Sequence, residues 1–269
     1  MPEGHTLHRL AGQLDDRFGG RVVHAASPQG RFADGAALLD GRTLTGAQAH
    51  GKHLFVTFDD EARVHVHLGL YGAFRFGTGE APAPVGQVRL RLTAPGDYAD
   101  LRGPTRCELL TAYEAHAVAA RLGPDPLRPD ADPERAWARI SRSRSSVAAL
   151  LMDQQILAGV GNVYRAEVLF RQGIDPYRAG RDLTRGEWDA LWADLGALMR
   201  EGVRLGRIDT VRPEHTPEAT GRAPRVDDHG GEVYVYRRAA RPCHVCGGEV
   251  RTAGLAARNL FWCPRCQQR

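Results

Sequence analysis

The chain has no long apolar run and almost no lysine. None of its apolar stretches approaches the about 18–20 residues needed to cross a bilayer, so we expect neither a membrane span nor a membrane partner. Its first residues lack the basic stretch and the apolar run of an export signal, which predicts a cytoplasmic protein. With 269 residues, 42% of them apolar, the chain can bury a substantial core, and its length predicts two domains.

Lys52 is the only lysine, so nearly all of the 36 basic residues are arginine. GC-rich coding alone would favour arginine in this way. A lysine amine, however, can lose its proton when its surroundings lower the pKa, whereas a guanidinium stays protonated. The single lysine is therefore a candidate for chemistry that arginine cannot perform.

The charge of the chain is concentrated in its last quarter. The formal net charge is only +4, but the segment from Arg200 to Arg269 holds 13 arginines against 8 acidic residues. A basic segment of this kind suits a polyanion such as nucleic acid. A solvated arginine-rich surface would give the same composition.

Cysteines are few, and four of the five lie in two close pairs. Cys243 and Cys246 form one CxxC, Cys263 and Cys266 form another, and 16 residues separate them. This is the spacing of a tetrahedral zinc site, and four protein ligands leave no open position, so we expect one structural Zn2+. Disulfides are the alternative, which the absence of an export signal disfavours. The fifth, Cys107, is expected to be a small buried residue and not a nucleophile.

The first half of the chain has the pattern of a β-domain. A short helix is expected over residues 2–13, and from Arg21 to about Leu110 short apolar runs, several of them alternating, are separated by Gly, Pro and Asp. Such runs predict an antiparallel sandwich or barrel. The runs are Val22–Val23, Leu54–Phe58, Val64–Leu68, Phe74–Phe76 and Val88–Leu92. His65 and His67 alternate with valines in one of them and are expected to be structural or exposed.

The second half has a helical period. The proline-dense stretch Gly123–Pro129 predicts a hinge or linker, and residues 207–231, rich in Pro, Gly and charge, predict a flexible loop. Between them, four segments carry apolar helical faces. These segments are residues 137–140, 147–157, 163–171 and 187–200.

Two polar groups of this half are candidates for binding phosphate. Gly159–Asn162 lies between two predicted helices, where Asn162 could cap the next helix and backbone amides could bind an anion. Arg258 precedes the second cysteine pair, in a span long enough for a hairpin with the arginine near its tip. An ordinary tight turn and a solvated arginine are the alternatives.

The chain begins Met1-Pro2-Glu3. A small second residue usually permits removal of the initiator methionine, which would leave the secondary amine of Pro2 at the N-terminus. The reference pKa of an α-amino group is about 7.7–8.0, so a useful fraction is unprotonated near neutral pH. Such an amine can attack an aldehyde carbon to form an iminium, with Glu3 as a general acid beside it. A processing remnant followed by a helix-start acid would look the same.

Taken together, these stretches resemble the formamidopyrimidine-DNA glycosylase/endonuclease VIII family. The resemblance runs in order over essentially the whole chain. It is carried by "PEG" at the start, "GKHL" at 51–54, "LGPDPL" at 122–127, "LLMDQQILAGVGNVYRAEVLFRQGIDP" at 150–176 and the terminal "RPCHVCGG…ARNLFWCPRCQ".

The resemblance implies an α+β fold. It consists of an N-terminal antiparallel β-sandwich and a C-terminal helical domain with a helix–two-turn–helix and a zinc-finger β-hairpin. We assign residues 1–120 to the catalytic sandwich, 121–135 to a linker, 136–230 to the helical DNA-binding domain and 231–269 to the zinc finger.

The resemblance also implies roles for individual residues. Pro2 matches the family's nucleophile and Glu3 its adjacent acid, while Lys52 matches a lysine that contacts the DNA backbone at the lesion and is needed for glycosylase action. The residues implied to contact DNA are Leu70 and Tyr71, inserted in the gap left by a flipped base, and Asn162 and Arg258, which clamp phosphates. The zinc ligands are the four paired cysteines.

The implied activity is that of a bifunctional DNA glycosylase and AP lyase of base excision repair. It would act as a monomer on damaged double-stranded DNA in the bacterial cytoplasm, at the nucleoid, and the "PEG" start and Leu70–Tyr71 favour the endonuclease VIII branch and oxidised pyrimidines. The strand would be nicked by β,δ-elimination from a Schiff base at Pro2.

Two departures from the family pattern motivate an alternative, a non-catalytic or abasic-site-only zinc-finger DNA-binding paralogue. Thr6 stands where the family usually has a second glutamate, and Gly69 stands where the branch tends to have a polar gap-filling residue. A third hypothesis, an N-terminal-proline tautomerase, explains neither the paired cysteines nor the long helical motif.

Overall fold

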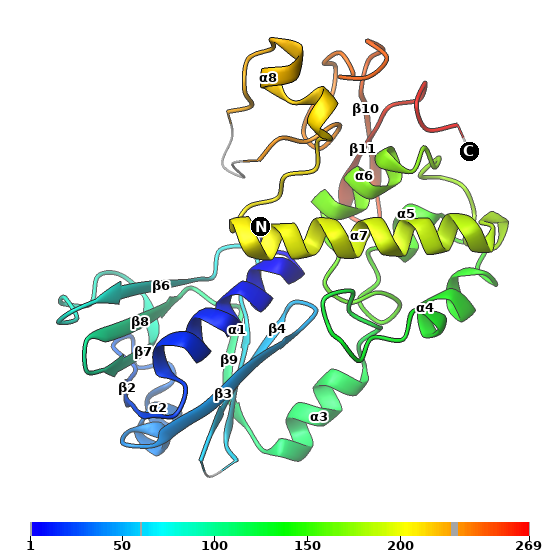
Figure 1. Cartoon of the computed structure of the whole chain (residues 1–269). Helices are drawn as coiled ribbons and strands as arrows, with labels where there is room; N and C mark the ends of the chain where they lie inside the picture. Colours follow the sequence, from blue (N-terminus) through cyan, green and yellow to red (C-terminus); the bar gives the residue numbers. More distant parts are fainter. Residues whose placement is uncertain (1, 60, 227–230, 269) are drawn as a thin grey trace. The chain divides into compact units, whose positions relative to one another are not determined.

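A computed structural model describes residues 2–59, 61–226 and 231–268 of the chain. The chain divides into two compact units, Met1–Arg121 and Leu122–Arg269 (Figure 1). The predicted α+β class is confirmed, with a sandwich of two antiparallel sheets in the first unit and helices with a β-hairpin in the second. Within the described ranges, no helix is both long and apolar enough to cross a membrane.

The first unit is built on two antiparallel sheets. One has the strand order β1-β3-β4-β5-β9 and the other the order β2-β7-β8-β6. Apolar residues that alternate along the strands meet in one core, so the predicted sandwich follows from the period-2 pattern. The strands are β1 Arg21–Val22, β2 His24–Ala26, β3 Thr43–His50, β4 His53–Phe58, β5 Arg63–His67, β6 Ala73–Thr78, β7 Val88–Ala94, β8 Asp97–Arg102 and β9 Arg106–Leu110.

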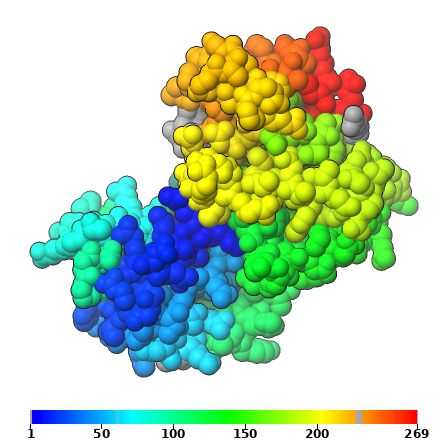
Figure 2. All heavy atoms as spheres, viewed as in Figure 1, coloured from blue at the N-terminus to red at the C-terminus, as the bar shows by residue number. Residues whose placement is uncertain are grey.

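Helix α1 (Gly4–Phe18) covers β3 and β4 and is longer than the sequence predicts. Leu7 and Leu14 are fully buried, and Phe18, one turn after Leu14, extends the same face by a further contact. In Figure 2 the deep-blue atoms of α1 form part of the unit's surface, so the helix has one buried and one exposed side. The other helices of this unit are α2 (Ala33–Leu39) and α3 (Ala112–Ala120).

The second unit packs around helix α6 (Asn162–Arg171), whose residues from Asn162 to Phe170 are all buried. It contacts the long helix α7 (Arg185–Leu205) and a strand of the finger hairpin. The remaining helices are α4 (Pro133–Ile140), α5 (Val147–Leu150) and the short η1 (Gly180–Asp182), η2 (Pro213–His215) and α8 (Pro217–Thr220).

The prediction of one helix over residues 147–157 is wrong. Helix α5 ends at Leu150, and a turn-rich connection leads to α6. The side chain of Gln154 organises this connection, since it donates to the carbonyl of Val160 at 2.9 Å and accepts from the amide of Gly159 at 3.0 Å. Gly159 has a φ of +89°, which a glycine adopts without strain.

Two other stretches predicted as irregular are partly ordered. The amide of Gly123 donates to the carbonyl of Gln154 at 2.9 Å and that of Ala158 to Pro124 at 3.1 Å, so the start of the proline-dense stretch belongs to the second unit. The predicted loop over 207–231 contains η2 and α8, and its residues 227–230 lie outside the described ranges.

The finger hairpin consists of β10 (Arg251–Leu255) and β11 (Arg258–Trp262). Its two-residue tip, Ala256 and Ala257, has positive φ at both positions, as a type I′ turn requires. The pair Leu255 and Arg258 closes the turn, which places Arg258 directly beside the tip.

Candidate active site and nucleic-acid interface

Pro2 and Glu3 lie at the N-terminal end of α1. Glu3 is the N-cap residue, with extended backbone, and its carbonyl accepts from the amide of Thr6 at 2.9 Å. Its side chain is 0% exposed, which is rare for a carboxylate. The N-terminal end of a helix carries a partial positive charge that stabilises an anion there. Met1 lies outside the described residues.

His5 and Thr6 occupy the position next to this acid. Burial, assisted by the positive charge of Arg9, lowers the pKa of His5 to about 4. His5 is therefore neutral near pH 7, and its Nε2 lies 3.3 Å from the hydroxyl of Thr6. A neutral hydrogen-bonded pair thus stands where the resemblance leads one to expect a second glutamate.

Lys52 lies in the two-residue turn that joins β3 to β4. The paired residues His50 and His53 close this turn. Gly51 takes the first turn position with a φ of +58°, the left-handed conformation that such a turn requires there. The carbonyl of Lys52 accepts a hydrogen bond from Nδ1 of His67 on β5 at 2.9 Å. The turn that carries the lysine is therefore tied to the neighbouring hairpin.

A hydrogen-bonded chain of side chains runs across the sheet behind this turn. Nδ1 of His65 lies 2.9 Å from Oε1 of Glu108 on β9, and Nε2 of His65 lies 2.8 Å from Nδ1 of His53. Burial lowers the pKa of His53 to about 3 and, against the effect of Glu108, lowers that of His65 too. Burial opposes ionisation of Glu108, but hydrogen bonds from His65 and Arg106 outweigh it and lower the pKa of this carboxyl group.

These protonation states fix which nitrogen donates and which accepts in each of these hydrogen bonds. A carboxylate only accepts, so Nδ1 of His65 carries the proton, and the Nε2 of this neutral ring accepts from Nδ1 of His53. Likewise, Nδ1 of His67 must carry the proton that it donates to the carbonyl of Lys52. The rings of His53 and His65 therefore have their protons on Nδ1 and lone pairs on Nε2, and His67 has a proton on Nδ1.

The rings of this chain are also stacked. His53 lies 5.1 Å from both His65 and His67, and Phe55 lies 5.0 Å from His65, measured between ring centroids, with interplanar angles of 12–18°. His53 is paired with His67, and Phe55 with His65, across β4 and β5. The sequence pattern marked His65 and His67 as structural or exposed, and His65 is in fact 1% exposed.

Leu70 and Tyr71 lie in the connection between β5 and β6. They are 51% and 85% exposed, so two large apolar side chains extend into solvent at adjacent positions. Gly69 has a φ of +68°, and a Cβ there would lie 1.8 Å from Oγ1 of Thr105. A side chain at position 69 would therefore clash with Thr105 and would also strain the backbone.

Asn162 and the finger hairpin meet in the second unit. The side-chain amide of Asn162 donates to the carbonyl of Asn259 at 2.9 Å. Asn259 directly follows the exposed Arg258 in the sequence. The buried guanidinium of Arg165 binds both Asn162 and the same carbonyl. The predicted capping role of Asn162 is wrong, because Gly161 is the N-cap residue and Asn162 is the first residue of α6.

Glu167 is an important residue that the sequence analysis did not single out. It is 0% exposed, and its carboxylate accepts from the hydroxyl of Thr210 at 2.7 Å. It also accepts from the backbone amides of Tyr234, Val235 and Tyr236, at 2.7, 2.9 and 2.8 Å. This one side chain anchors the segment that leads into the finger. The available signal was an acid inside an apolar helical face.

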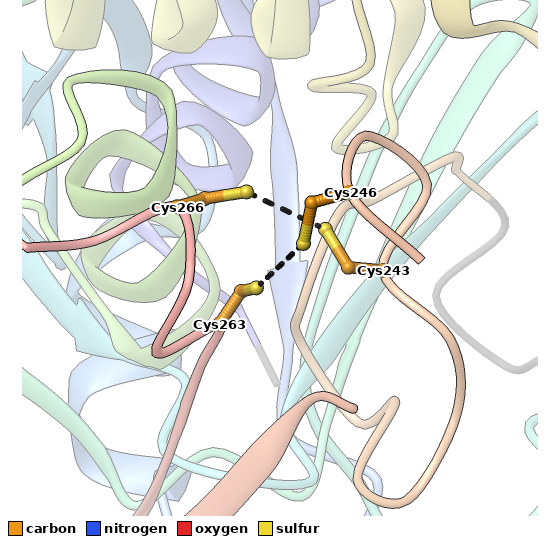
Figure 3. Close-up of side chains that lie close together, drawn as sticks. All are labelled: Cys243, Cys246, Cys263 and Cys266. Atoms are coloured by element: carbon orange, nitrogen blue, oxygen red, sulfur yellow. Dashed lines mark hydrogen bonds between the residues drawn. The ribbon is translucent and has the colours of Figure 1, made fainter. Parts of the chain in front are cut away.

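The four paired cysteines converge on one point (Figure 3). Their sulfur atoms lie within 4.8 Å of one another, with Cys243–Cys266 at 3.9 Å and Cys246–Cys263 at 3.5 Å. A tetrahedron with Zn–S bonds of about 2.3 Å has edges of about 3.8 Å, so the arrangement fits one structural Zn2+.

Backbone groups support this site. The amide of Val245 lies 3.5 Å from the sulfur of Cys243, and that of Gly248 lies 3.4 Å from the sulfur of Cys246, contacts that stabilise thiolates. The side chain of Gln267 accepts from the amide of Cys263 at 2.9 Å and donates to the carbonyl of Ile174 at 3.0 Å, which ties the finger to the helices.

The fifth cysteine and the histidine between two ligands take no part in the metal site. Cys107 was expected to be buried but is half-buried, and its partial burial raises its pKa to about 12, which agrees with the prediction of an unreactive thiol. His244 was expected to be exposed but is half-buried, and its Nδ1 lies 3.3 Å from the guanidinium of Arg238.

Family models match three parts of the chain. The formamidopyrimidine-DNA glycosylase N-terminal domain matches residues 1–107, the formamidopyrimidine-DNA glycosylase H2TH domain matches residues 122–213, and the zinc finger found in FPG and IleRS matches residues 241–269.

Curated relatives match over the full length. The chain is 55% identical to "Endonuclease 8 1" of Mycobacterium tuberculosis, over 99% of this chain and 100% of that one. It is 31% identical to "Endonuclease 8" of Escherichia coli, with the same coverage. Among solved structures, the complex between the Lactococcus lactis Fpg and an abasic site containing DNA has a TM-score of 0.79 at 23% identity, over 99% of this chain and 100% of that chain, and so supports the fold.

Proposed function

The chain belongs to the formamidopyrimidine-DNA glycosylase/endonuclease VIII family, and from this premise we propose that it removes oxidised pyrimidines from DNA through a Schiff base at Pro2. At the coarser level it is an endonuclease VIII-like DNA glycosylase and AP lyase of base excision repair. The observation that carries the proposal is the position of Pro2 and the buried Glu3 at the positive end of α1.

The damaged nucleotide first leaves the helical stack. Unstacking costs a few kcal/mol, less at a damaged base. Insertion of apolar side chains kinks the duplex and offsets part of this cost. Leu70 and Tyr71 suit this role because both are large, apolar, adjacent and more than half exposed. We propose damaged double-stranded DNA as the partner, bound by a monomer at the bacterial nucleoid.

Base removal then proceeds at C1′ of the flipped nucleotide. The positive end of α1 favours the unprotonated form of an amine at Pro2, which uses its lone pair to form the N–C1′ bond. The glycosidic bond breaks, the base departs with the proton that the Pro2 nitrogen loses, and Glu3 in its acid form protonates the ring oxygen as the sugar opens. The resulting iminium acidifies the C2′ proton, so β-elimination and then δ-elimination release the two phosphates.

Charged and amide groups hold the DNA backbone during these steps. Lys52 contacts the phosphate next to the lesion, while Asn162 and Arg258 bind phosphates from the second unit. The hydrogen bond from Asn162 to the carbonyl of Asn259 supports this assignment, since it holds the exposed Arg258 beside the start of α6.

Borohydride trapping tests the lyase chemistry. The processed chain, incubated with an oligonucleotide that contains one abasic site, is expected to give a covalent adduct on reduction. The adduct should be absent in a form that retains Met1, and present in Pro84→Gly, a matched change in an exposed loop. Failure of the processed wild type to form an adduct would contradict the proposal.

An abasic-site-only enzyme is the second candidate, and the neutral pair His5–Thr6 in place of a glutamate is the observation that favours it. Duplexes that each contain one defined oxidised base separate the two candidates. We expect release of oxidised pyrimidines ahead of oxidised purines. Trapping on an abasic site without release of any base would instead establish the second candidate.

A further inference from the structure

We propose that His65 and Glu108 are positioning residues for Lys52, and that they act through His53 and His67 without contact with DNA. The inference rests on the proposed role of Lys52 in base removal. It assigns a function to an imidazole ladder, which we define as His53, His65 and His67 stacked on one face of β4 and β5.

The ladder has two arms that converge on the Lys52 turn. In one arm Glu108 orients His65, which orients His53, the residue that follows Lys52 in the chain. In the other arm His67 donates to the carbonyl of Lys52 itself at 2.9 Å. The parallel stacking of His53 on His67, with centroids 5.1 Å apart, joins the two arms.

The ladder is placed where a rigid support matters. A two-residue turn has few internal contacts, and a lysine side chain has four rotatable carbon–carbon bonds. The position of the Lys52 amine therefore depends on how firmly the main chain of the turn is held. His65 is 1% exposed and lies on the interior strand β5, which is paired with β4 and β9. Reacting groups displaced by about 1 Å can lose roughly 100-fold in rate, so a small tilt of the turn has a large effect.

The charged and titratable groups around the ladder leave His53 and His65 neutral and fix the direction of their hydrogen bonds. These groups are His50 at the end of β3, Lys52 in the turn, and Arg106 and Glu108 on β9. Arg106 lies 3.2 Å from Glu108 and keeps that carboxylate ionised, so Glu108 holds the proton of His65 on Nδ1. Removal of Glu108 would therefore free His65 to exchange tautomers and would release the orientation of His53.

Substitutions of His65 separate hydrogen bonding from packing. His65→Phe keeps an aromatic ring in the stack with Phe55 and His53 but removes both hydrogen bonds. His116→Phe, an exposed histidine on α3, is the matched control. Glu108→Gln keeps an acceptor for Nδ1 of His65, whereas Glu108→Ala removes it, so the pair tests rescue by a conservative change.

The readout is single-turnover release of a damaged base, compared with borohydride trapping on a preformed abasic site. We expect His65→Phe and Glu108→Ala to slow base release roughly 10- to 100-fold. Trapping, DNA affinity and the melting temperature should stay close to those of the wild type. Glu108→Gln should recover most of the rate, and His116→Phe should have no effect.

A double-mutant cycle with Lys52→Ala decides the question. If the ladder acts through Lys52, His65→Phe has no further effect on base release in the Lys52→Ala background. Equal slowing in both backgrounds, or a wild-type rate for His65→Phe, would overturn the inference. A wild-type chain that neither releases a base nor forms an adduct would instead overturn the proposed function.

Nitrogen-15 spectra of the imidazole rings give a second, activity-free readout. We expect the three rings of the ladder to carry their protons on Nδ1 near neutral pH. In Glu108→Ala, His65 and His53 should show a mixture of tautomers. Protonation on Nε2 in the wild-type chain would contradict the assigned direction.

Discussion

The two units hold their functional side chains by different means, as Glu108 and Glu167 illustrate. Glu167 binds three consecutive backbone amides directly, so it fixes the main chain before the finger with one residue. Glu108 reaches the Lys52 turn only through rings, since it orients His65 and His65 orients His53. Direct anchoring gives stability, whereas a relayed chain gives orientation, and the two should respond differently to substitution.

The largest effect is expected on loss of the metal. Structural zinc sites contribute about 10–16 kcal/mol of apparent binding free energy. Cys263→Ser should therefore unfold the finger hairpin and abolish tight DNA binding, while the sandwich stays folded. Hydrogen exchange resolves this, because amides of β10 and β11 should lose protection and those of β4 and β5 should keep it.

The matched control for the metal site is Cys107→Ser, which changes a cysteine that is not a ligand. It should retain zinc and full protection of the hairpin. Unchanged exchange in β10 and β11 after verified removal of zinc would count against a structural metal.

A smaller loss is expected for Glu167→Gln. An amide accepts more weakly than a carboxylate and brings two donors into a buried site, so we expect a loss of roughly 3 kcal/mol in the free energy of unfolding. The amides of Tyr234, Val235 and Tyr236 should exchange faster. Glu218→Gln, on the exposed side of a short helix, is the control, and equal effects of the two changes would remove the special role given to Glu167.

The histidines of the first unit predict a pH dependence of stability. His53 has its pKa lowered from 6.5 to about 3, so the unfolded chain binds more protons than the folded chain between these values. The contribution of neutral His53 is therefore fully present above about pH 6.5 and is lost as the pH falls towards 3. Urea unfolding of His53→Phe should show a flatter pH profile than the wild type over this window. Identical profiles would contradict a neutral, half-buried His53.

The smallest effect is expected at the hairpin tip. If Arg258 binds one phosphate, Arg258→Ala should reduce the slope of log affinity against log salt by about 0.9. Base release at saturating enzyme should remain. Arg251→Ala, an exposed arginine at the far end of the same hairpin, is the control, and an equal change in slope for both would indicate a general charge effect.

Features that depend on local spacing were predictable from the sequence. The four zinc ligands follow from the CxxC pairs, and the start of α1 follows from the spacing of its leucines. Strand β4 follows from an apolar run and β5 from alternation. These signals lie within a few residues of one another, so no knowledge of the fold is needed to read them.

Features that depend on distant partners were not predictable. Strand β3 has small and polar residues, so its sequence alone does not predict a strand. Its position is set by pairing with β4 and by Asp15 on α1. The carboxylate of Asp15 accepts from the amide of Ala47 at 2.6 Å, next to the register shift between Leu44 and Gly46. The ladder needs the register of β4, β5 and β9 together. Helix α5 ends at Leu150, and the side chain of Gln154 organises the connection that follows through Gly159 and Val160, which no periodicity reveals.

The central claim is that the nitrogen of Pro2 bonds to the sugar. Mass spectrometry of the borohydride-reduced adduct, after proteolysis, tests it most directly. The account predicts a peptide that begins at Pro2 and carries the reduced sugar fragment on its first residue. A fragment attached to Lys52, or a fully active chain that still carries Met1, would contradict it.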